Sequence, residues 1–216
     1  FRSGLFGAPF DGTTSFRPGT RFGPSAMRQV SDSMEDYSPY QDKLVEDALV
    51  CDLGDIELPM GDTAMALDLI EDTCRHILEA GKKPAMLGGE HLVTLGTVRA
   101  LAEKYPDLHI LHFDAHTDLR DDFLGVEVSH APVIKKCWDI LGDGRIHSFG
   151  IRSGLREEFV FGHDHLDFHP FLIGSRNIGK ADKIWTSEEL IRSYQESMDA
   201  LARTLKDQAT PLYITL

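Results

Sequence analysis

The chain has 216 residues, of which 42% are hydrophobic and 26% charged, and its formal net charge is −13. These values are ordinary for a globular protein, and the length suffices for one large domain or two small ones. The acidic excess argues against binding to nucleic acid or to an anionic membrane, because both need clustered lysine and arginine. It is compatible with a cationic substrate.

The sequence contains no run of about 18 apolar residues, which argues against a membrane span. Cys51, Cys74 and Cys137 are odd in number and far apart, so they predict no disulfide framework. We therefore expect a reducing compartment, the cytoplasm. The chain starts without methionine and stops within an apolar, strand-like run, so we also expect it to be truncated at the C-terminus.

Short apolar runs alternate with segments of helical periodicity, and a Gly/Thr/Pro-rich loop at 11–24 follows the first run. Asp62 is a predicted N-cap, and Gly81 ends the helix that follows it. Thr186 and Glu189 are spaced for a capping box. The predicted strands are 5–9, 48–53, 84–87, 108–113, 146–151 and 211–216. The other predicted helices are 25–30, 91–104, 130–141 and 187–206.

Strands separated by helices of this length are typical of βαβ units. The sequence therefore predicts an α/β fold with a mostly parallel sheet flanked by helices. Functional sites in such sheets lie at the carboxyl ends of the strands. No repeat, low-complexity tract or linker divides the chain, so we expect a single domain over residues 1–216.

The segment LHFDAHTD, at the end of the fourth predicted strand, carries the strongest chemical signal. Asp114, His116 and Asp118 alternate along it, and extended backbone would project them from one face. Like charges converging there repel one another, and a divalent cation would resolve the conflict. The mixed N/O donor set suits Mn²⁺, Zn²⁺, Fe²⁺ or Co²⁺. A solvated loop with incidental charges is the alternative.

A second segment, GGEH at 88–91, follows the preceding predicted strand. Its glycines allow a tight turn, after which His91 opens a helix. Alone, this histidine suits a helix cap or a core position. Because consecutive strands of a parallel sheet are often neighbours, His91 could also face Asp114 and His116 across the strand ends.

GGEH followed by HFDAHTD resembles the ureohydrolase family of arginase, agmatinase and guanidinobutyrase. The resemblance covers most of the chain. The segments PFDGTTSFRPGTRFGP, DAHTDLRDDFLGVEVSHA and FGIRSGLREEF look like agmatinase-type sequences rather than arginases. The resemblance implies a three-layer sandwich of the arginase/deacetylase type, with a central, mostly parallel sheet. It also implies a homo-oligomer, a trimer or hexamer.

The resemblance further implies that His91, Asp114, His116 and Asp118 ligate two manganese ions. His91 and Asp118 would serve one ion, His116 the other, and Asp114 both. The family's remaining ligands come from a DxD motif after a strand like the terminal one, and that motif would lie beyond the last residue. His130, in VSHA, matches a histidine that the family uses for proton transfer.

The implied reaction is hydrolysis of a guanidino compound to urea and an amine by a hydroxide bridging two manganese ions, with His130 relaying a proton to the leaving amine. Agmatine, giving putrescine and urea, is the expected substrate. Guanidinobutyrate, arginine and formimidoylglutamate stay open as alternatives. The hypothesis from another class is a non-catalytic protein that keeps the fold and binds a partner.

Other polar residues match no ligand of the family. We expect His112 to be a packing residue beside Asp114 or a support for it. A second group forms a local cluster before a predicted surface loop at 175–183, and we expect it to be an exposed polar stretch. Its members are His163, Asp164, His165, Asp167 and His169.

Overall fold

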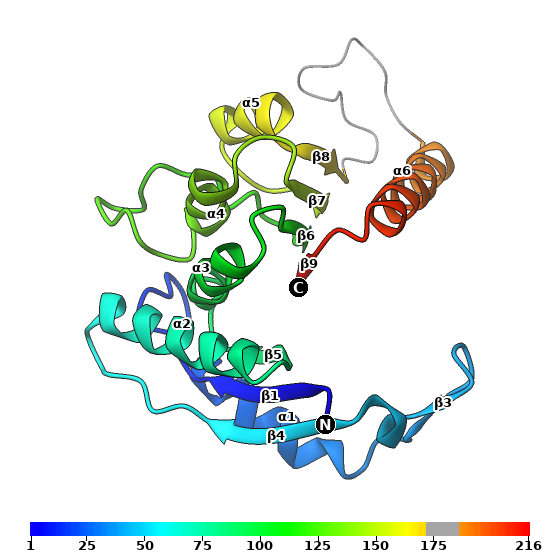
Figure 1. The fold of residues 1–216 in the computed structure, drawn as a ribbon. Coiled ribbons are helices and arrows are strands. Elements are labelled where there is room, and N and C mark those ends of the chain that lie inside the picture. Colours follow the sequence, from blue (N-terminus) through cyan, green and yellow to red (C-terminus); the bar gives the residue numbers. More distant parts are fainter. Residues whose placement is uncertain (172–185) are drawn as a thin grey trace. The chain divides into compact units, whose positions relative to one another are not determined.

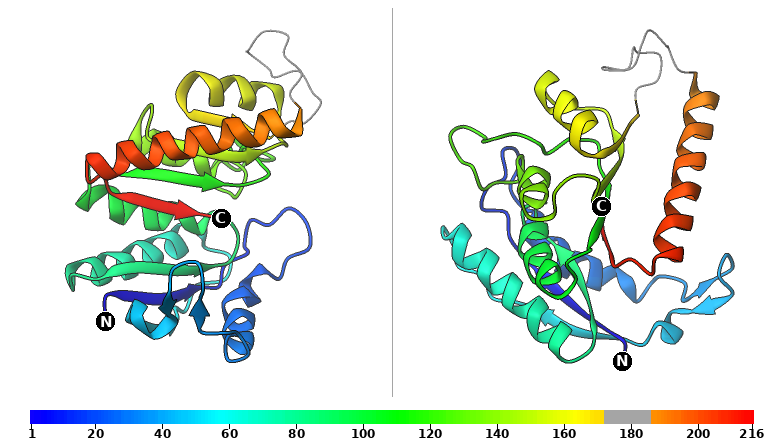
Figure 2. Two further views of the ribbon diagram at one scale, coloured as in Figure 1. Left: turned by 90° about the vertical axis from the view of Figure 1, so that its right-hand side faces the viewer. Right: turned by 45° about the horizontal axis from the view of Figure 1, so that its top comes forward.

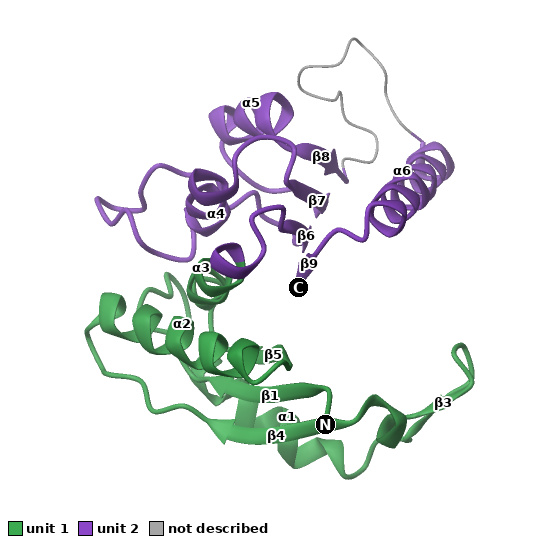
Figure 3. Cartoon of the chain, in the orientation of Figure 1, with its two compact units in different colours: residues 1–101 green, residues 102–216 purple. Residues whose placement is uncertain are grey.

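The computed structural model describes residues 1–171 and 186–216. The chain divides into two compact units, residues 1–101 and residues 102–216 (Figure 3). The prediction of a single domain over residues 1–216 stays a prediction. The surface loop predicted at 175–183 lies outside the described residues.

Unit 1 contains a three-stranded parallel sheet in the order β4-β1-β5 (Figure 1). Helices α1 and α2 lie on opposite faces of this sheet (Figure 1 and Figure 2). The strands are β1 (Ser3–Ala8), β4 (Val50–Asp55) and β5 (Lys83–Gly88). The helices are η1 (Thr20–Phe22), α1 (Gly23–Ser31), η2 (Val45–Ala48), α2 (Thr63–Glu79) and α3 (Val93–Lys104), which starts in this unit.

The predicted boundaries of α2 are confirmed. The Asp62 carboxylate accepts a hydrogen bond from the amide of Met65 at 2.9 Å, which satisfies one of the helix's first donors. Past the C-terminal end, Gly81 adopts a φ of 71°, a value that favours glycine. The helix buries an apolar stripe at helical spacing, made of Ala66, Leu67, Ile70, Cys74, Ile77 and Leu78.

Unit 2 contains a four-stranded parallel sheet in the order β8-β7-β6-β9. Helices α4 and α5 lie on one face and α6 on the other (Figure 1 and Figure 2). The strands are β6 (His109–Phe113), β7 (Ile146–Ile151), β8 (Asp167–Pro170) and β9 (Leu212–Thr215). The helices are α4 (Val133–Leu141), α5 (Arg156–His165) and α6 (Ser187–Asp207). Parallel sheets flanked by helices confirm the predicted α/β class.

The start of α6 also follows its prediction. The hydroxyl of Thr186 accepts from the amide of Glu189 at 3.2 Å, and the Glu189 carboxylate accepts from the Thr186 amide at 3.0 Å. This reciprocal pair is the predicted capping box. Among the described residues, no helix combines the length and the apolar character needed to cross a membrane.

Several elements were not predicted, among them the short helices η1 and η2 and two larger regions. A short antiparallel hairpin, β2 (Tyr37–Ser38) and β3 (Lys43–Leu44), projects from unit 1. In unit 2, α5 and β8 occupy the stretch that was predicted to be polar and exposed. That prediction was wrong, because Leu166, Phe168 and Pro170 alternate toward the core and only Asp164 of the five polar residues is exposed.

The three cysteines differ in their access to solvent. Cys51, on β4, is partly exposed, whereas Cys74 on α2 and Cys137 on α4 are buried. Burial raises the pKa of the Cys74 thiol to about 11, although a hydrogen bond with Thr97 opposes the shift.

A close backbone contact joins the turn after β5 to the first loop of unit 1. The Phe10 carbonyl accepts a hydrogen bond from the amide of Glu90 at 2.8 Å. A Cβ added at Gly89 would stand 1.8 Å from the same carbonyl oxygen. Because only a glycine allows this approach, the GGEH turn is seated on the loop that begins at Phe10.

We therefore expect Gly89→Ala to destabilise the protein by about 1–3 kcal/mol, the usual cost of forcing atoms into packed space. Gly23→Ala is the matched control, because a Cβ there meets the nearest atom, the Gly88 carbonyl oxygen, at 3.4 Å. Urea denaturation of both variants measures the difference. Equal midpoints for the two variants would contradict the close approach.

Candidate metal centre

The residues with the strongest chemical signal lie in the loop after β6. The strand ends at Phe113, and residues 114–117 then stay beside β7 and the residues that follow it. The Asp114 amide donates to the Phe149 carbonyl at 3.1 Å, and the Ala115 carbonyl accepts from the amides of Arg152 and Ser153 at 2.8 and 2.9 Å. Asp118 has a φ of 51°, in the left-handed region. The prediction of extended backbone through Asp118 was therefore wrong. Non-glycine residues in this conformation are uncommon and gather at functional sites.

Asp114 is at the centre of this loop's polar contacts. Its Oδ1 accepts from the backbone amide of His116 at 2.8 Å and lies 3.3 Å from His116 Nδ1. Its Oδ2 lies 3.6 Å from Nε2 of His112. The Asp114 side chain is 21% exposed and that of His116 is 65% exposed. A carboxylate between two imidazoles at a strand end suits a divalent cation.

His112 supports Asp114 from within the sheet. Its side chain is fully buried, and Nδ1 lies 3.1 Å from the hydroxyl of Ser148 on the neighbouring strand β7. The expected place of His112 beside Asp114 is confirmed. Contact with the serine at one ring nitrogen leaves the other ring nitrogen directed at the carboxylate.

The backbone of Asp118 is fixed from two sides. Its carbonyl oxygen accepts from the amides of Ile134 and Lys135, at 3.0 and 3.2 Å, at the start of α4. The neighbouring residues Thr117 and Leu119 are buried, at 2% and 3% exposure. The Asp118 side chain is partly exposed between them. The loop therefore presents a carboxylate on a backbone that is packed into unit 2.

Glu158 is a residue of this region that the sequence analysis missed. It lies in the first turn of α5 and is 3% exposed. Its Oε1 accepts from the Thr117 hydroxyl at 2.7 Å and from the Leu119 amide at 3.2 Å. The sequence REEF at 156–159 contained a signal for this buried acid, because two adjacent glutamates precede a phenylalanine. A helix that buries Phe159 turns one of those acids inward.

His130 is partly buried just before α4. Its ring meets the ring of Phe123 edge-on, with centroids 5.4 Å apart and an interplanar angle of 61°. Phe123 is itself held by a tight turn, because it exchanges two backbone hydrogen bonds of 3.0 Å with Val126. The Arg120 guanidinium lies 5.3 Å from the Phe123 ring centroid. Phe123 thus connects His130 to the loop that carries Asp118.

His91 belongs to unit 1. It is partly exposed, and its carbonyl accepts from the amide of Thr94 at 3.1 Å as α3 begins. The residue before it, Glu90, is buried and accepts from the amide and the hydroxyl of Thr13, both at 2.8 Å. Thr14 donates its hydroxyl to the same carboxylate at 3.2 Å. His91 thus follows an anchored turn, and its approach to the unit 2 residues stays a prediction.

A second buried acid, Asp11, orders the rest of the first loop. Its carboxylate accepts from the Gly19 amide at 2.8 Å and forms a two-point ion pair with Arg21, with contacts of 2.8 and 2.6 Å. The hydrogen bonds from Arg21 and Gly19 outweigh burial and lower the pKa of the Asp11 carboxyl. The Asp11 carboxylate therefore joins the two ends of the loop from 11 to 21.

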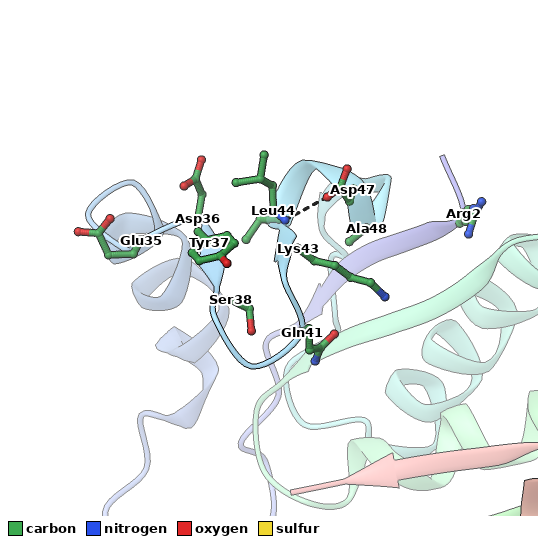
Figure 4. Close-up of a pocket in the computed structure, with 11 residues that line it drawn as sticks. Arg2, Glu35, Asp36, Tyr37, Ser38, Gln41, Lys43, Leu44, Asp47 and Ala48 are labelled. Atoms are coloured by element: carbon green, nitrogen blue, oxygen red, sulfur yellow. Dashed lines mark hydrogen bonds between the residues drawn. The ribbon is translucent and has the colours of Figure 1, made fainter.

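A pocket of about 580 Å³ lies beside the β2–β3 hairpin of unit 1 (Figure 4). Its walls are mostly charged or polar and include Arg2, Glu35, Asp36 and Lys43, and one wall is fixed by a hydrogen bond of 3.0 Å from the Leu44 amide to Asp47. None of the predicted ligands lines this pocket. We therefore place the candidate site at the strand ends and not here.

The predicted polar cluster contributes two residues to a different arrangement, which we call the histidine ladder: His109, His147, Asp167 and His169. His109 Nδ1 lies 2.8 Å from His147 Nε2, and the two rings stack. The Asp167 carboxylate lies 2.8 Å from both His147 Nδ1 and His169 Nε2. His109 and Asp167 begin β6 and β8, whereas His169 pairs in register with Phe149, toward the carboxyl end of β7.

The comparisons with known proteins agree with the resemblance of the sequence. A model of the arginase family matches residues 1–216. The agmatinase of Bacillus subtilis (strain 168) is 52% identical over 155 residues, which cover 72% of this chain and 53% of that protein. The crystal structure of the agmatine ureohydrolase of Thermoplasma volcanium aligns with a TM-score of 0.77 and 31% identity, covering 99% of this chain and 65% of that one.

A third relative has a different printed activity. The proclavaminate amidino hydrolase from Streptomyces clavuligerus aligns with a TM-score of 0.75 and 27% identity, covering 99% of this chain and 67% of that one. The fold is thus the α/β fold that these hydrolases share, and the chain belongs to the arginase family. It spans about half the length of the curated relatives that it matches.

The histidine ladder should make stability depend on pH. Burial, together with the nearby His147, lowers the pKa of His109. Burial opposes ionisation of Asp167, but hydrogen bonds from His147 and His169 outweigh it and lower that pKa as well. Folded-state pKa values below the unfolded ones stabilise the protein at high pH. The two contributions are lost as the pH falls below about 6.5 for histidine and about 3.9 for aspartate.

We therefore expect the urea midpoint to fall as the pH is lowered from 7 toward 5, and His109→Gln to flatten that decline. His76→Gln, at an exposed histidine of α2, is the control and should leave the decline unchanged. Urea titrations at several pH values provide the measurement. An unaltered pH dependence in the His109 variant would contradict the role of the ladder.

Proposed function

We propose that this chain acts in a metal-dependent ureohydrolase that hydrolyses a guanidino compound to urea and an amine. The observation that carries the proposal is Asp114, whose two carboxylate oxygens lie 3.3 Å from a ring nitrogen of His116 and 3.6 Å from one of His112. Membership of the arginase family supports it. The proposal includes the cytoplasm as the compartment, as the cysteine pattern indicates, and a trimer or hexamer as the assembly, as the resemblance implies.

The donors of the loop fit manganese. Asp114, His116 and Asp118 offer two carboxylates and an imidazole, the mixed oxygen and nitrogen set that a first-row divalent ion accepts. Together with His91 of unit 1, we propose them as ligands of two manganese ions. When bound, such ions would supply an activated water for hydrolysis at neutral pH. The packed backbone at Asp118 would hold its ligand in place before an ion binds.

We assign His130 to the proton that the leaving amine needs. An imidazole titrates near neutral pH and can donate that proton directly or through water. The Phe123 ring at its edge restricts the rotation of the histidine side chain. His130 would therefore act from a fixed position rather than as a mobile surface group.

Agmatine is the proposed substrate, with putrescine and urea as products. The 52% identity to a protein named agmatinase supports this choice, and the acidic balance of the chain suits a dication. Guanidinobutyrate, arginine and formimidoylglutamate share the reacting group and are the alternatives. A non-catalytic protein that uses the fold to bind a partner is the contrasting hypothesis, and urea release separates it from the enzyme.

The first test measures bound manganese and urea together in the full-length protein. After Mn²⁺ loading, we expect agmatine to release urea faster than guanidinobutyrate, arginine or formimidoylglutamate. Asp114→Asn and His116→Ala should lose most of the bound manganese and of the urea release, because each removes a ligand. Their far-UV circular dichroism should match the parent protein.

Asp164→Asn is the control for this test, since it changes an exposed aspartate of α5. It should bind metal and release urea like the parent. Unchanged manganese content in both ligand variants would overturn the site. Bound manganese without urea release from any of the four compounds would favour the non-catalytic protein.

The second test separates His130 from the ligands. We expect His130→Ala to keep its manganese and to lower kcat for the guanidino substrate by about 10²–10⁴-fold, the usual contribution of one proton-transfer group. Steady-state kinetics and metal analysis of the same preparation give both values. Parental turnover in this variant would show that His130 serves only to pack against Phe123.

A further inference from the structure

We propose that Glu158 is a positioning residue of the candidate metal centre. Its buried carboxylate fixes the backbone that carries His116 and Asp118 and, through Arg120 and Phe123, the ring of His130. This inference rests on the proposed function and deepens it. It concerns residues of unit 2 alone.

Burying the charge of Glu158 carries an energetic cost. Glu158 is 3% exposed, and an ionised carboxylate is expensive to bury unless donors surround it. Three donors do so at hydrogen-bond distance: the Thr117 hydroxyl at 2.7 Å, the Leu119 amide at 3.2 Å and the Leu155 amide at 2.5 Å. Two of the three belong to the ligand loop. The carboxylate is therefore shared between the start of α5 and that loop.

Two of these donors lie on either side of a proposed metal ligand. Thr117 and Leu119 flank Asp118, and the Leu119 amide belongs to the peptide bond that directly follows it. Glu158 therefore holds the backbone where Asp118 has its φ of 51°. A left-handed aspartate persists only when its surroundings impose it, and the carboxylate of Glu158 is one such constraint.

Thr117 is closely packed against the chain that precedes α5. A Cβ added at Gly154 would stand 2.5 Å from the Thr117 hydroxyl oxygen, so the threonine is pressed against the chain before α5. The Thr117 amide also donates to the Ser153 carbonyl at 3.1 Å. Thr117 is thus held by backbone on one side and by Glu158 on the other. Its fixed position also restrains the backbone of the adjacent residues, His116 and Asp118.

A second branch runs from Glu158 to His130. Arg120 Nε lies 3.7 Å from Glu158 Oε2, and the Arg120 guanidinium lies 5.3 Å from the Phe123 ring centroid. Phe123 in turn meets His130 edge-on at 5.4 Å. The negative charge of Glu158 thus orients a cation, and the cation holds the aromatic ring beside the proposed proton donor.

The two branches predict separable effects on the Mn²⁺-loaded full-length protein. Glu158→Gln keeps the shape but removes the charge and one acceptor, so we expect Mn²⁺ affinity to fall about 10-fold, as for residues that support metal ligands. We expect kcat to fall as well, with a smaller change in KM. Arg120→Gln should lower kcat with little change in Mn²⁺ affinity. Free Mn²⁺ measured by electron paramagnetic resonance gives the affinity without any assay of turnover.

Glu157→Gln is the matched control, because Glu157 is the exposed acid next to Glu158 in the same helical turn. It should leave Mn²⁺ affinity and kcat unchanged. Thr117→Val keeps the size of the side chain and loses the hydroxyl, so it should weaken Mn²⁺ binding. Thr117→Ser keeps the hydroxyl and should bind Mn²⁺ like the parent protein. The threonine pair decides the matter if Glu158→Gln fails to fold.

The outcomes distinguish the inference from the function on which it rests. Parent protein that binds Mn²⁺ and releases urea, with Glu158→Gln and Thr117→Val both matching Glu157→Gln in Mn²⁺ affinity, overturns the positioning role alone. Parent protein that binds no Mn²⁺ overturns the proposed function and this inference with it. Weaker Mn²⁺ binding in Thr117→Val that Thr117→Ser reverses supports the inference.

Discussion

A carboxylate removed from water has to be surrounded by donors, and this requirement shapes the functional loops of both units. In unit 1, the Glu90 carboxylate accepts hydrogen bonds from the amide and the hydroxyl of Thr13 and from the hydroxyl of Thr14. In unit 2, the Glu158 carboxylate accepts hydrogen bonds from the Thr117 hydroxyl and the Leu119 amide. Each acid holds a loop that is remote in sequence. The donors converge because the acid cannot be buried without them.

This arrangement explains how a loop can be both irregular and fixed. The proposed ligands of unit 2 lie beyond the last residue of β6, where backbone hydrogen bonds to Phe149, Arg152 and Ser153 reach as far as Thr117. At Asp118, order comes from side chains and from the start of α4, whose amides donate to the Asp118 carbonyl. A site that is ordered before its ligand arrives avoids part of the entropic cost of binding.

The sequence allowed the regular elements and the chemistry to be predicted, because both depend on local patterns. The bounds of β7, the Asp62 cap and the capping box at Thr186 follow from short-range periodicity and capping rules. The same patterns could not reveal the left-handed backbone at Asp118 or the inward turn of Glu158. Those depend on contacts between segments 39 and 41 residues apart. The exposure assigned to the polar cluster was wrong for a related reason, since the tertiary placement of Phe168 decides which side is covered.

The uneven burial of the three cysteines has a practical consequence for chemical labelling. A thiol reacts as the thiolate, so Cys74, with its pKa raised to about 11 and its side chain buried, will be slow toward alkylating reagents at neutral pH. Cys137 is shielded by burial, whereas Cys51 on β4 is partly exposed. A maleimide fluorophore should therefore attach first to unit 1 at Cys51, leaving the loops of unit 2 chemically untouched. A single reporter could thus be installed without engineering the chain.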